Sequence, residues 1–167
     1  MTPVTVALAL GGNEGAVEQT LRLALRQLRA SLGPLVAAPL YRSRAVSPIP
    51  QPDYLNTAAL ARTALPPEAV LALAKALERA AGRRRGPRFG PRPLDIDLLL
   101  YDGLLSDSAE MTLPHPRLRE RRFVLEPLAE IAPDLPVPPD GAPVRELLAR
   151  VAPEPLERVL GRGWDLL

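Results

Sequence analysis

Residues 94–101 read Leu-Asp-Ile-Asp-Leu-Leu-Leu-Tyr (LDIDLLLY) and supply the last strand of the predicted fold. Polar and apolar residues alternate at its beginning, which predicts a β-strand with Asp95 and Asp97 on one face and Ile96 on the other. The preceding segment, 82–93, is rich in Gly, Pro and Arg and is predicted to be a loop. An arginine-rich loop therefore leads into a strand that carries two carboxylates.

The sequence before this strand predicts a series of regular elements. Short apolar runs bounded by Gly and Pro indicate strands, and apolar residues at three- and four-residue steps indicate helices. The expected elements are strands at 4–10, 35–43 and 54–61 and helices at 17–32 and 68–81. With 94–101 they follow the order β-α-β-β-α-β. This order is typical of an α+β, ferredoxin-like fold with an antiparallel sheet and both helices on one face. Further C-terminal helices are expected within 116–131 and at 144–151.

The composition is that of one globular domain. The chain has 167 residues, of which 47% are hydrophobic and 24% charged, and no repeat or linker divides it, so a single domain over 1–167 is expected. The chain contains no cysteine, which excludes disulfides and cysteine-bound metal. No apolar run is long enough to span a membrane, and 1–10 lacks the features of a signal peptide. We therefore expect a cytoplasmic protein.

Positive charge is clustered along the chain. The formal net charge is only +2, which argues against a general polyanion binder. Two clusters of arginine stand out, Arg83, Arg84, Arg85, Arg88 and Arg92 in the loop and Arg117, Arg119, Arg121 and Arg122 further on. Arginine pairs bidentately with phosphate, and phosphoryl-type transfer depends mainly on positioning and charge stabilisation. A solvated charge run or a nucleic-acid patch is the alternative for the first cluster.

The two aspartates of the strand are candidate metal ligands. On a strand, Asp95 and Asp97 have Cα atoms roughly 6.5–7 Å apart on one face. Two carboxylates held this close repel each other unless a cation lies between them. Oxygen ligands on a rigid strand suit Mg²⁺, which in turn favours a phosphate partner. Alternatively, both side chains lie on the solvated face of an edge strand, and the pair alone does not decide between these readings.

A few other residues could bind a ligand. His115 is the only histidine, and the prolines on both sides of it suit a ring held toward a ligand, although a lone histidine can equally be a packed residue. Tyr54 and Phe123 could sandwich a flat heterocycle or pack in the core. Asn56 lies two residues after Tyr54 on the same strand face, where its amide could read the polar edge of such a ring.

The motifs match one known family in the same order along the chain. The matching segments are 9–13 (ALGGN), 41–43 (YRS), 51–56 (QPDYLN), 88–99 (RFGPRPLDIDLL), 114–116 (PHP), 121–128 (RRFVLEPL) and 130–133 (EIAP). On these segments the chain resembles the 6-hydroxymethyl-7,8-dihydropterin pyrophosphokinases of folate biosynthesis. The strongest match is 88–99, which is similar to the family signature R-W-G-P-R-T-L-D-I-D-L-L.

The resemblance implies an activity and an ATP site. The activity is transfer of a diphosphoryl group from ATP to the hydroxymethyl group of the reduced pterin, with AMP as the other product. Asp95 and Asp97 would hold two Mg²⁺ ions that bridge the triphosphate, and Arg83 and Arg92 would stabilise charge during transfer. The residues that the resemblance implies for ATP binding are Glu78, Arg83, Arg85, Arg92, Leu98, Thr112, His115 and Arg121.

The resemblance also implies a pterin site. Its residues would be Ser43, Val46, Tyr54, Asn56, Asp95 and Phe123, with the two aromatic rings on either side of the pterin. The loops at 43–53 and 82–92 match mobile loops of the family that close over the nucleotide. The implied partners are small molecules, ATP and hydroxymethyl-dihydropterin, with no nucleic acid and no membrane, and we expect a monomer.

Some positions depart from the family pattern. Phe89 replaces the usual tryptophan, Pro93 stands where threonine is common, and Lys75 occupies a position that is often glutamine. None of these changes removes a metal ligand or Arg92, so an active enzyme is expected. A ferredoxin-like RNA-binding module is the alternative function. It would need exposed aromatic residues on central strands, and only 4% of the chain is aromatic.

Overall fold

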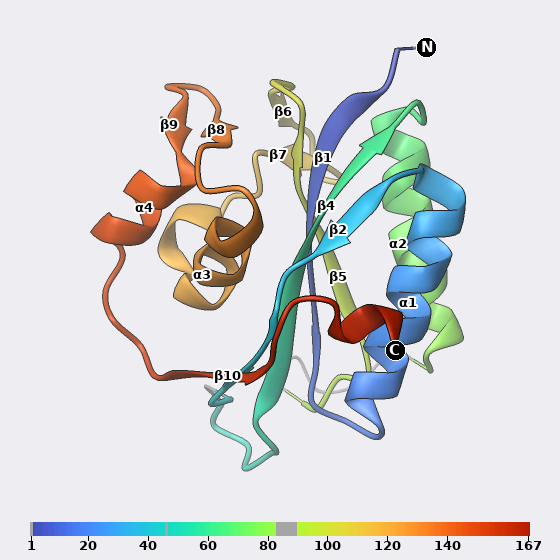
Figure 1. Ribbon diagram of the computed structural model, residues 1–167, viewed down its shortest axis with the longest axis vertical. Coiled ribbons are helices and arrows are strands. Elements are labelled where there is room, and N and C mark those ends of the chain that lie inside the picture. Colours follow the sequence, from blue (N-terminus) through green and yellow to red (C-terminus); the bar gives the residue numbers. More distant parts are fainter. Residues whose placement is uncertain (1, 46, 83–89) are drawn as a thin grey trace.

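The computed structural model describes residues 2–45, 47–82 and 90–167 (Figure 1). The predicted first part of the fold forms β1 (Val4–Gly12), α1 (Val17–Leu32), β2 (Leu35–Ala37), β3 (Leu40–Ser43), β4 (Tyr54–Thr63), α2 (Pro67–Ala80) and β5 (Asp95–Tyr101). The remainder forms the short strands β6 (Ser106–Asp107), β7 (Thr112–Leu113), β8 (Pro136–Val137) and β9 (Ala142–Pro143), the helices α3 (Arg122–Ile131) and α4 (Val144–Arg150), and β10 (Leu156–Leu160). Short 3₁₀ turns occur at 118–120 and 164–166.

The main sheet is antiparallel, as expected. Its strands lie in the order β10-β3-β4-β1-β5, and β2 also pairs with β4. The predicted strand at 35–43 is wrong in one respect, because the chain leaves the ladder between β2 and β3. At that break the backbone N–H of Ala38 donates to the carbonyl of Ala58 at 2.8 Å. One expected strand is therefore two short ones that pair with successive parts of β4.

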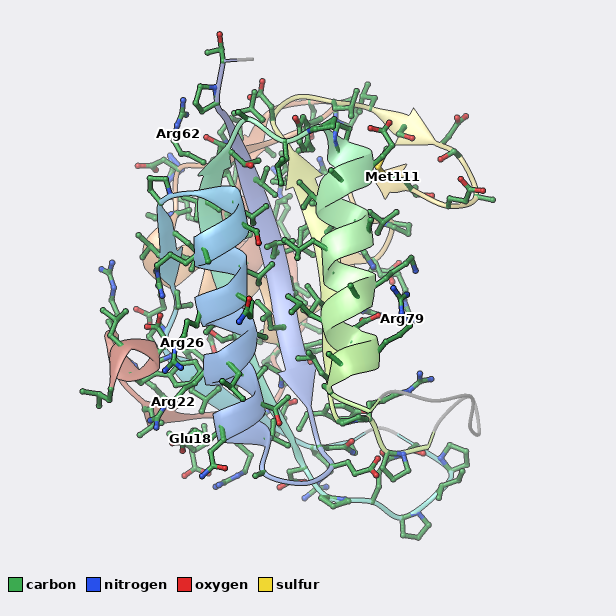
Figure 2. The ribbon with its side chains drawn as sticks, turned by 90° about the vertical axis from the view of Figure 1, so that its right-hand side faces the viewer. Glu18, Arg22, Arg26, Arg62, Arg79 and Met111 are labelled. Atoms are coloured by element: carbon green, nitrogen blue, oxygen red, sulfur yellow. The ribbon has the colours of Figure 1, made fainter. Side chains whose placement is uncertain are left out.

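Helices α1 and α2 lie side by side on one face of the sheet (Figures 1 and 2). The apolar residues predicted to form the inner face of α1 are all buried, namely Val17, Leu21, Ala24, Leu25, Leu28 and Leu32. Glu18 and Arg22 lie on its other side, joined by a 2.8 Å ion pair. The helix ends at Gly33, whose φ of 126° is open to glycine but strained for other residues. The 3.6-residue period thus correctly predicted both the length and the buried face of α1.

Helices α3 and α4 lie on the opposite face (Figure 1). A second buried cluster fills this side and includes Ala7 and Ala9 of β1, Ala58 of β4 and Leu125 of α3. Tyr41 of β3 reaches across to α3, where its hydroxyl donates to Glu130 at 2.7 Å. Burial, followed by this hydrogen bond, raises the pKa of Tyr41 well above its ordinary value. The phenol therefore remains a donor and ties the sheet to α3.

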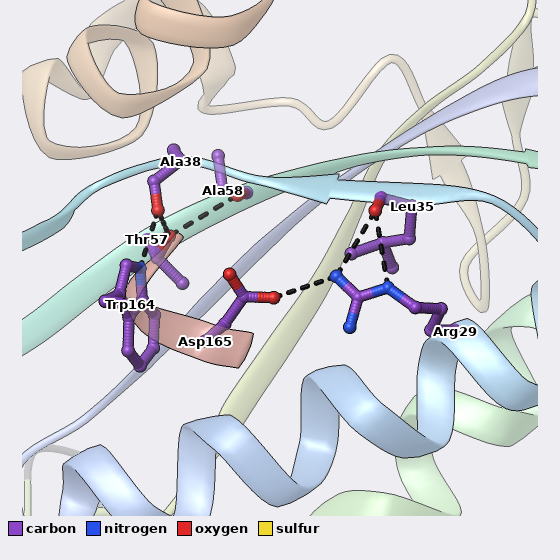
Figure 3. A network of polar contacts seen from close by, with 7 residues as sticks. All are labelled: Arg29, Leu35, Ala38, Thr57, Ala58, Trp164 and Asp165. Carbon is purple, nitrogen blue, oxygen red and sulfur yellow. Dashed lines mark hydrogen bonds and ion pairs between the residues drawn. The ribbon is translucent and has the colours of Figure 1, made fainter. Parts of the chain in front are cut away.

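The C-terminal segment adds strand β10 to the sheet, and the turn at 164–166 then packs against α1. We call residues 164–166 the C-terminal latch. Strand β10 pairs with β3, and its first residue, Leu156, lies opposite Ser43. The buried indole of Trp164 donates to the carbonyl of Ala38 at 2.8 Å, at the break between β2 and β3. Beside it, Arg29 of α1 donates to Asp165 at 2.8 Å (Figure 3). The end of the chain is thereby fixed to both α1 and the sheet.

Two elements differ at one end from the bounds that the sequence predicts. The strand expected at 4–10 continues through Gly11 and Gly12, because β4 pairs with both glycines and β5 pairs with Gly11. The helix expected within 116–131 begins at Arg122, with a 3₁₀ turn before it. Across the described ranges 2–45, 47–82 and 90–167, no helix is both long enough and apolar enough to cross a membrane.

Candidate active site

The candidate residues of two strands lie on the α3 face of the sheet. In β4, Tyr54 and Asn56 have the same parity as Ala58, which packs in the α3-side cluster. In β5, Asp95 and Asp97 have the parity opposite to Ile96, which packs beneath α1 and α2. The prediction that Ile96 faces the core is confirmed. Alternation therefore brings polar residues of β4 and β5 to one side of the sheet.

Gly11 lies between the two groups. It pairs with Asn56 of β4 on one side and with Asp95 of β5 on the other. Neighbouring strands are about 4.8 Å apart, so these two residues lie roughly 10 Å from each other across the sheet. A Cβ added at Gly11 would lie 2.8 Å from the amide oxygen of Asn56. The missing side chain therefore lets the amide of Asn56 lie directly over Gly11.

The aspartates of β5 are supported from the other face by α2. The buried carboxylate of Glu78 accepts a hydrogen bond of 2.8 Å from the backbone N–H of Ile96, the residue between them. Asp97 keeps a side chain that is 42% exposed. A buried acceptor thus holds the backbone of β5, while the carboxylate of Asp97 on the opposite face stays accessible to solvent.

Two basic side chains lie near Asp97. Its Oδ2 is 3.8 Å from Nη1 of Arg121 and 4.0 Å from Nε2 of His115. Burial lowers the pKa of His115, with Asp97 acting in the opposite direction and Arg121 adding to the lowering. Burial also lowers the pKa of Arg121, against the effect of Asp97. The structure therefore brings together one carboxylate and two basic side chains that are far apart in the sequence.

His115 is oriented by its backbone and its neighbours. Its N–H donates to the carbonyl of Leu99 of β5 at 2.9 Å, and its Nδ1 accepts from the N–H of Arg117 at 3.2 Å. The preceding Leu113–Pro114 bond is cis. The acceptor role of Nδ1 leaves Nε2 as the ring nitrogen that faces Asp97. These hydrogen bonds orient the imidazole ring, and the ligand-binding role of His115 stays a prediction.

The polar group of β4 is joined to β3. The amide of Asn56, which is 6% exposed, donates to the hydroxyl of Ser43 at 2.6 Å. Tyr54 lies opposite Ser43 in the β3–β4 ladder and is half-buried. Phe123 lies in the first turn of α3, and the guanidinium of Arg121 stacks over its ring at 5.5 Å. Arg121 thereby connects the aromatic ring to Asp97.

The remaining predicted residues have different positions. Leu98 packs beneath α1 and α2 with 6% of its surface exposed, so its side chain is on the face away from the aspartates. Thr112 is exposed on β7, where its hydroxyl donates to the carbonyl of Ser108 at 3.1 Å. Arg92 is half-buried in the segment before β5. Val46, Arg83, Arg85 and Phe89 lie outside the described residues.

The paired carboxylates fit a magnesium ion that also binds phosphate. Such an ion uses one or two protein carboxylates and takes its other ligands from water and the phosphates. Asp95 and Asp97 provide two such groups on one strand face, and Asp97 lies beside the guanidinium of Arg121 and the imidazole of His115. Within the part of the chain that the structure describes, no three or more histidine, cysteine, aspartate or glutamate side chains form a metal-binding group.

Sequence reasoning gave no role to two residues that shape this site. Gly11 leaves room for the amide of Asn56, and the buried Asn13 holds surrounding loops together by hydrogen bonds to Gln51 and Arg92. Both belong to the matching segment 9–13, so the motif marked them. Their roles follow only from the pairing of β1 with β4 and β5 and from contacts across long stretches of sequence.

Comparison with known proteins points to one family. The family model described as 7,8-dihydro-6-hydroxymethylpterin-pyrophosphokinase (HPPK) matches residues 7–133. The chain is 42% identical over 146 residues to a 2-amino-4-hydroxy-6-hydroxymethyldihydropteridine pyrophosphokinase of Synechocystis sp., covering 86% of this chain and 74% of the relative. It is also 42% identical over 154 residues to the protein of the same name from Methylorubrum extorquens, covering 91% of this chain and 96% of that one.

A solved structure shows the same fold. A crystal structure described as HPPK-DHPS in complex with substrates superimposes with a TM-score of 0.70 at 13% identity. The match covers 89% of this chain and 43% of that chain, so the present chain spans less than half the length of that protein. At this identity the likeness concerns the fold.

Proposed function

The chain belongs to the 7,8-dihydro-6-hydroxymethylpterin-pyrophosphokinase family, and from this premise we propose that it transfers a diphosphoryl group from ATP to 6-hydroxymethyl-7,8-dihydropterin in folate biosynthesis. In this reaction the hydroxymethyl oxygen bonds to the β-phosphorus, the bond between that phosphorus and the α-phosphate oxygen breaks, and AMP leaves. The observation that carries the proposal is the pairing of Gly11 with Asn56 on one side and with Asp95 on the other, on the face of the sheet that α3 covers.

The nucleotide half of the proposed site is centred on β5. Asp95 and Asp97 would hold Mg²⁺, and we propose two ions. When bound, the metal supplies positive charge to the triphosphate and lowers the pKa of the attacking hydroxyl. Arg121 and His115, which lie beside Asp97, are proposed to contact phosphate oxygens of ATP. Arg92, which precedes the strand, is proposed to stabilise charge as AMP leaves.

Other residues complete the proposed nucleotide half less directly. Glu78 would act by holding the backbone of β5, to which it is already bonded. Leu98 would contact the nucleotide through its backbone, because its side chain is in the core. Thr112 on β7 is proposed near the nucleoside. Arg83 and Arg85 are proposed as further ATP contacts on the strength of the family resemblance alone.

The pterin half of the proposed site lies on β3 and β4. Asn56 presents an amide that can both donate and accept, and Ser43 fixes its orientation. Tyr54 and Phe123 are proposed to stack on the two faces of the pterin, and Val46 to line its edge. The two aromatic rings would provide contact area for the faces of the pterin, while the amide would select the heterocycle through hydrogen bonds to its edge. This division fits a flat, polar-edged substrate.

Three further points belong to the same proposal. We propose that β1, β2 with β3, β4, β5 and the two helices α1 and α2 form a ferredoxin-like core. We propose a cytoplasmic monomer that acts on small molecules and not on nucleic acid, which agrees with the low net charge of +2. We also propose that the whole of 1–167 acts as one pyrophosphokinase domain.

The nucleotide products test the proposal. The protein is incubated with ATP and Mg²⁺, with and without hydroxymethyl-dihydropterin, and the nucleotides are separated by chromatography. AMP is expected only when the pterin is present. Formation of ADP, or AMP formed equally without pterin, would refute the proposed reaction.

A further inference from the structure

Asn13, directly after β1, is bonded to two separate loops of the chain. Its amide oxygen accepts from the backbone N–H of Arg92 at 2.8 Å, and its own backbone N–H donates to the carbonyl of Arg92 at 2.8 Å. Its amide nitrogen donates to Oε1 of Gln51 at 2.6 Å and to the carbonyl of Pro52 at 3.0 Å. The residue is 4% exposed. A single buried amide thus joins segments that lie 38 to 79 residues away in the sequence.

The contact with the segment before β5 is close enough to require glycine next to Asn13. A Cβ at Gly12 would lie 2.5 Å from the carbonyl oxygen of Pro93 and 3.2 Å from that of Arg92. Both obstacles are backbone atoms, which do not move aside as a flexible side chain can. The end of β1 and the backbone at 92–93 therefore pack directly on each other, and a shift of one is transmitted to the other.

The two loops held by Asn13 lead into different halves of the site. Pro52 lies two residues before Tyr54, which begins β4 and the pterin half. Arg92 lies three residues before Asp95, which begins β5 and the metal and nucleotide half. The turn after β1 and the segments entering β4 and β5 lie at the same end of the sheet, the lower end in Figure 1. Asn13 therefore lies where a change that orders the chain at one half of the site can also order the chain at the other half.

We propose that Asn13 is a positioning residue that couples the two substrate halves, so that binding of the metal-nucleotide strengthens binding of the pterin through the bonds to Arg92, Gln51 and Pro52. This inference rests on the proposed function. Its physical basis is that ordering a loop costs conformational entropy, and a loop already tied to an ordered segment loses less on binding. The coupling is reciprocal, so the pterin strengthens nucleotide binding by the same factor.

Two substitutions of Asn13 separate this role from simple stabilisation. Asn13→Asp keeps an acceptor for the N–H of Arg92 but loses the donor to Pro52, facing that carbonyl with a negative charge instead. Asn13→Ala removes all side-chain bonds. Gln51→Met removes one bond from the other side and leaves Asn13 in place, which provides a variant with little risk to folding because Gln51 is in a partly exposed loop. Gln27→Met, at an exposed position of α1, is the matched control.

Calorimetry measures the coupling. Pterin affinity is determined for each protein with and without a non-hydrolysable ATP analogue and Mg²⁺, and the ratio of the two affinities is the coupling factor. The wild type and Gln27→Met are expected to share one factor above unity, while Asn13→Asp and Gln51→Met reduce it by roughly fivefold or more. Nucleotide affinity in the absence of pterin should stay near the wild-type value for Gln51→Met.

The outcomes distinguish the inference from the function on which it rests. If the wild type binds no pterin under either condition, the proposed function fails. If the wild type binds both ligands with a factor of one, or if the folded Gln51→Met variant keeps the wild-type factor, the function stands and the coupling role of Asn13 is refuted. Circular dichroism identifies any Asn13 variant that fails to fold, and Gln51→Met then decides the question alone.

Discussion

The backbone N–H of Ile96 donates to the buried carboxylate of Glu78, so a residue of α2 holds the strand one residue from each of the two aspartates. The bond crosses from the α2 face, where Ile96 packs, while Asp95 and Asp97 face the other way. A charged acceptor makes such a bond stronger than a neutral one. The position of the metal ligands therefore depends on a side chain that does not share their face.

Two substitutions of Glu78 should separate the effect of its hydrogen bond to β5 from the effect of its negative charge. Glu78→Gln retains an acceptor for the N–H of Ile96, whereas Glu78→Ala leaves that buried donor unpaired, at a cost of roughly 1–3 kcal/mol of unfolding free energy. In urea denaturation, the wild type should be the most stable, Glu78→Gln should be intermediate and Glu78→Ala the least stable. The rate of AMP formation should fall in the same order. An Ala variant as stable and active as the Gln variant would show that this bond does not support the strand.

Gly11 should be needed for pterin binding. A methyl group at this position would lie 2.8 Å from the amide oxygen of Asn56, so Gly11→Ala must displace that amide. Calorimetry should show pterin affinity reduced by roughly tenfold, the equivalent of one hydrogen bond of about 1.4 kcal/mol, with little change for the metal-nucleotide. Gly103→Ala is the control, because nothing lies within 4 Å of its added Cβ. Equal losses for both ligands would contradict the assignment of Asn56 to the pterin.

Asp97 should be required for turnover and dispensable for folding. Its side chain is 42% exposed and lies beside Arg121 and His115, so Asp97→Asn removes a proposed metal ligand and charge without opening a cavity. AMP formation should fall by roughly a hundredfold or more while the thermal unfolding midpoint changes little. Asp134→Asn, at an 84% exposed carboxylate, should retain full activity. Wild-type turnover of Asp97→Asn at saturating Mg²⁺ would remove Asp97 from the metal site.

The C-terminal latch should contribute to stability. Trp164→Phe removes the N–H that reaches Ala38 and leaves unfilled volume in the core (Figure 3), and Asp165→Ala removes the partner of Arg29. Each change should lower the free energy of unfolding by roughly 1–3 kcal/mol in urea denaturation. Leu167→Ala, at an 86% exposed position, should have no such effect. Unchanged stability of both variants would mean that the end of the chain packs without supporting the fold.

Much of the fold could be predicted from local pattern. The spacing of apolar residues in 17–32 predicted the bounds and the buried face of α1. The alternation of polar and apolar residues in 94–101 predicted that Ile96 and the aspartates lie on opposite faces. These features depend on neighbours a few residues away. By contrast, β10 was missed because its sequence, Leu-Glu-Arg-Val-Leu, is partly charged, and its partner β3 lies more than a hundred residues earlier.

The candidate site could be predicted only in part for the same reason. Strand parity and the family resemblance named Asp95, Asp97 and Asn56, but nothing local indicates that Gly11 pairs with residues from both halves. Glycine disfavours strands by itself, and the ladders of β4 and β5 override that preference. The contacts of Asn13 likewise depend on side chains meeting across the assembled sheet. Tertiary pairing, which the pattern does not contain, determines both.

In the proposed reaction, the β- and γ-phosphates of ATP move as one unit to the pterin. ATP labelled at the α-phosphorus and ATP labelled at the γ-phosphorus are each incubated with the protein, Mg²⁺ and hydroxymethyl-dihydropterin, and the products are separated. We expect the α label in AMP and the γ label in an equal amount of pterin diphosphate. The α label in ADP, or the γ label in a pterin monophosphate or in inorganic phosphate, would contradict it.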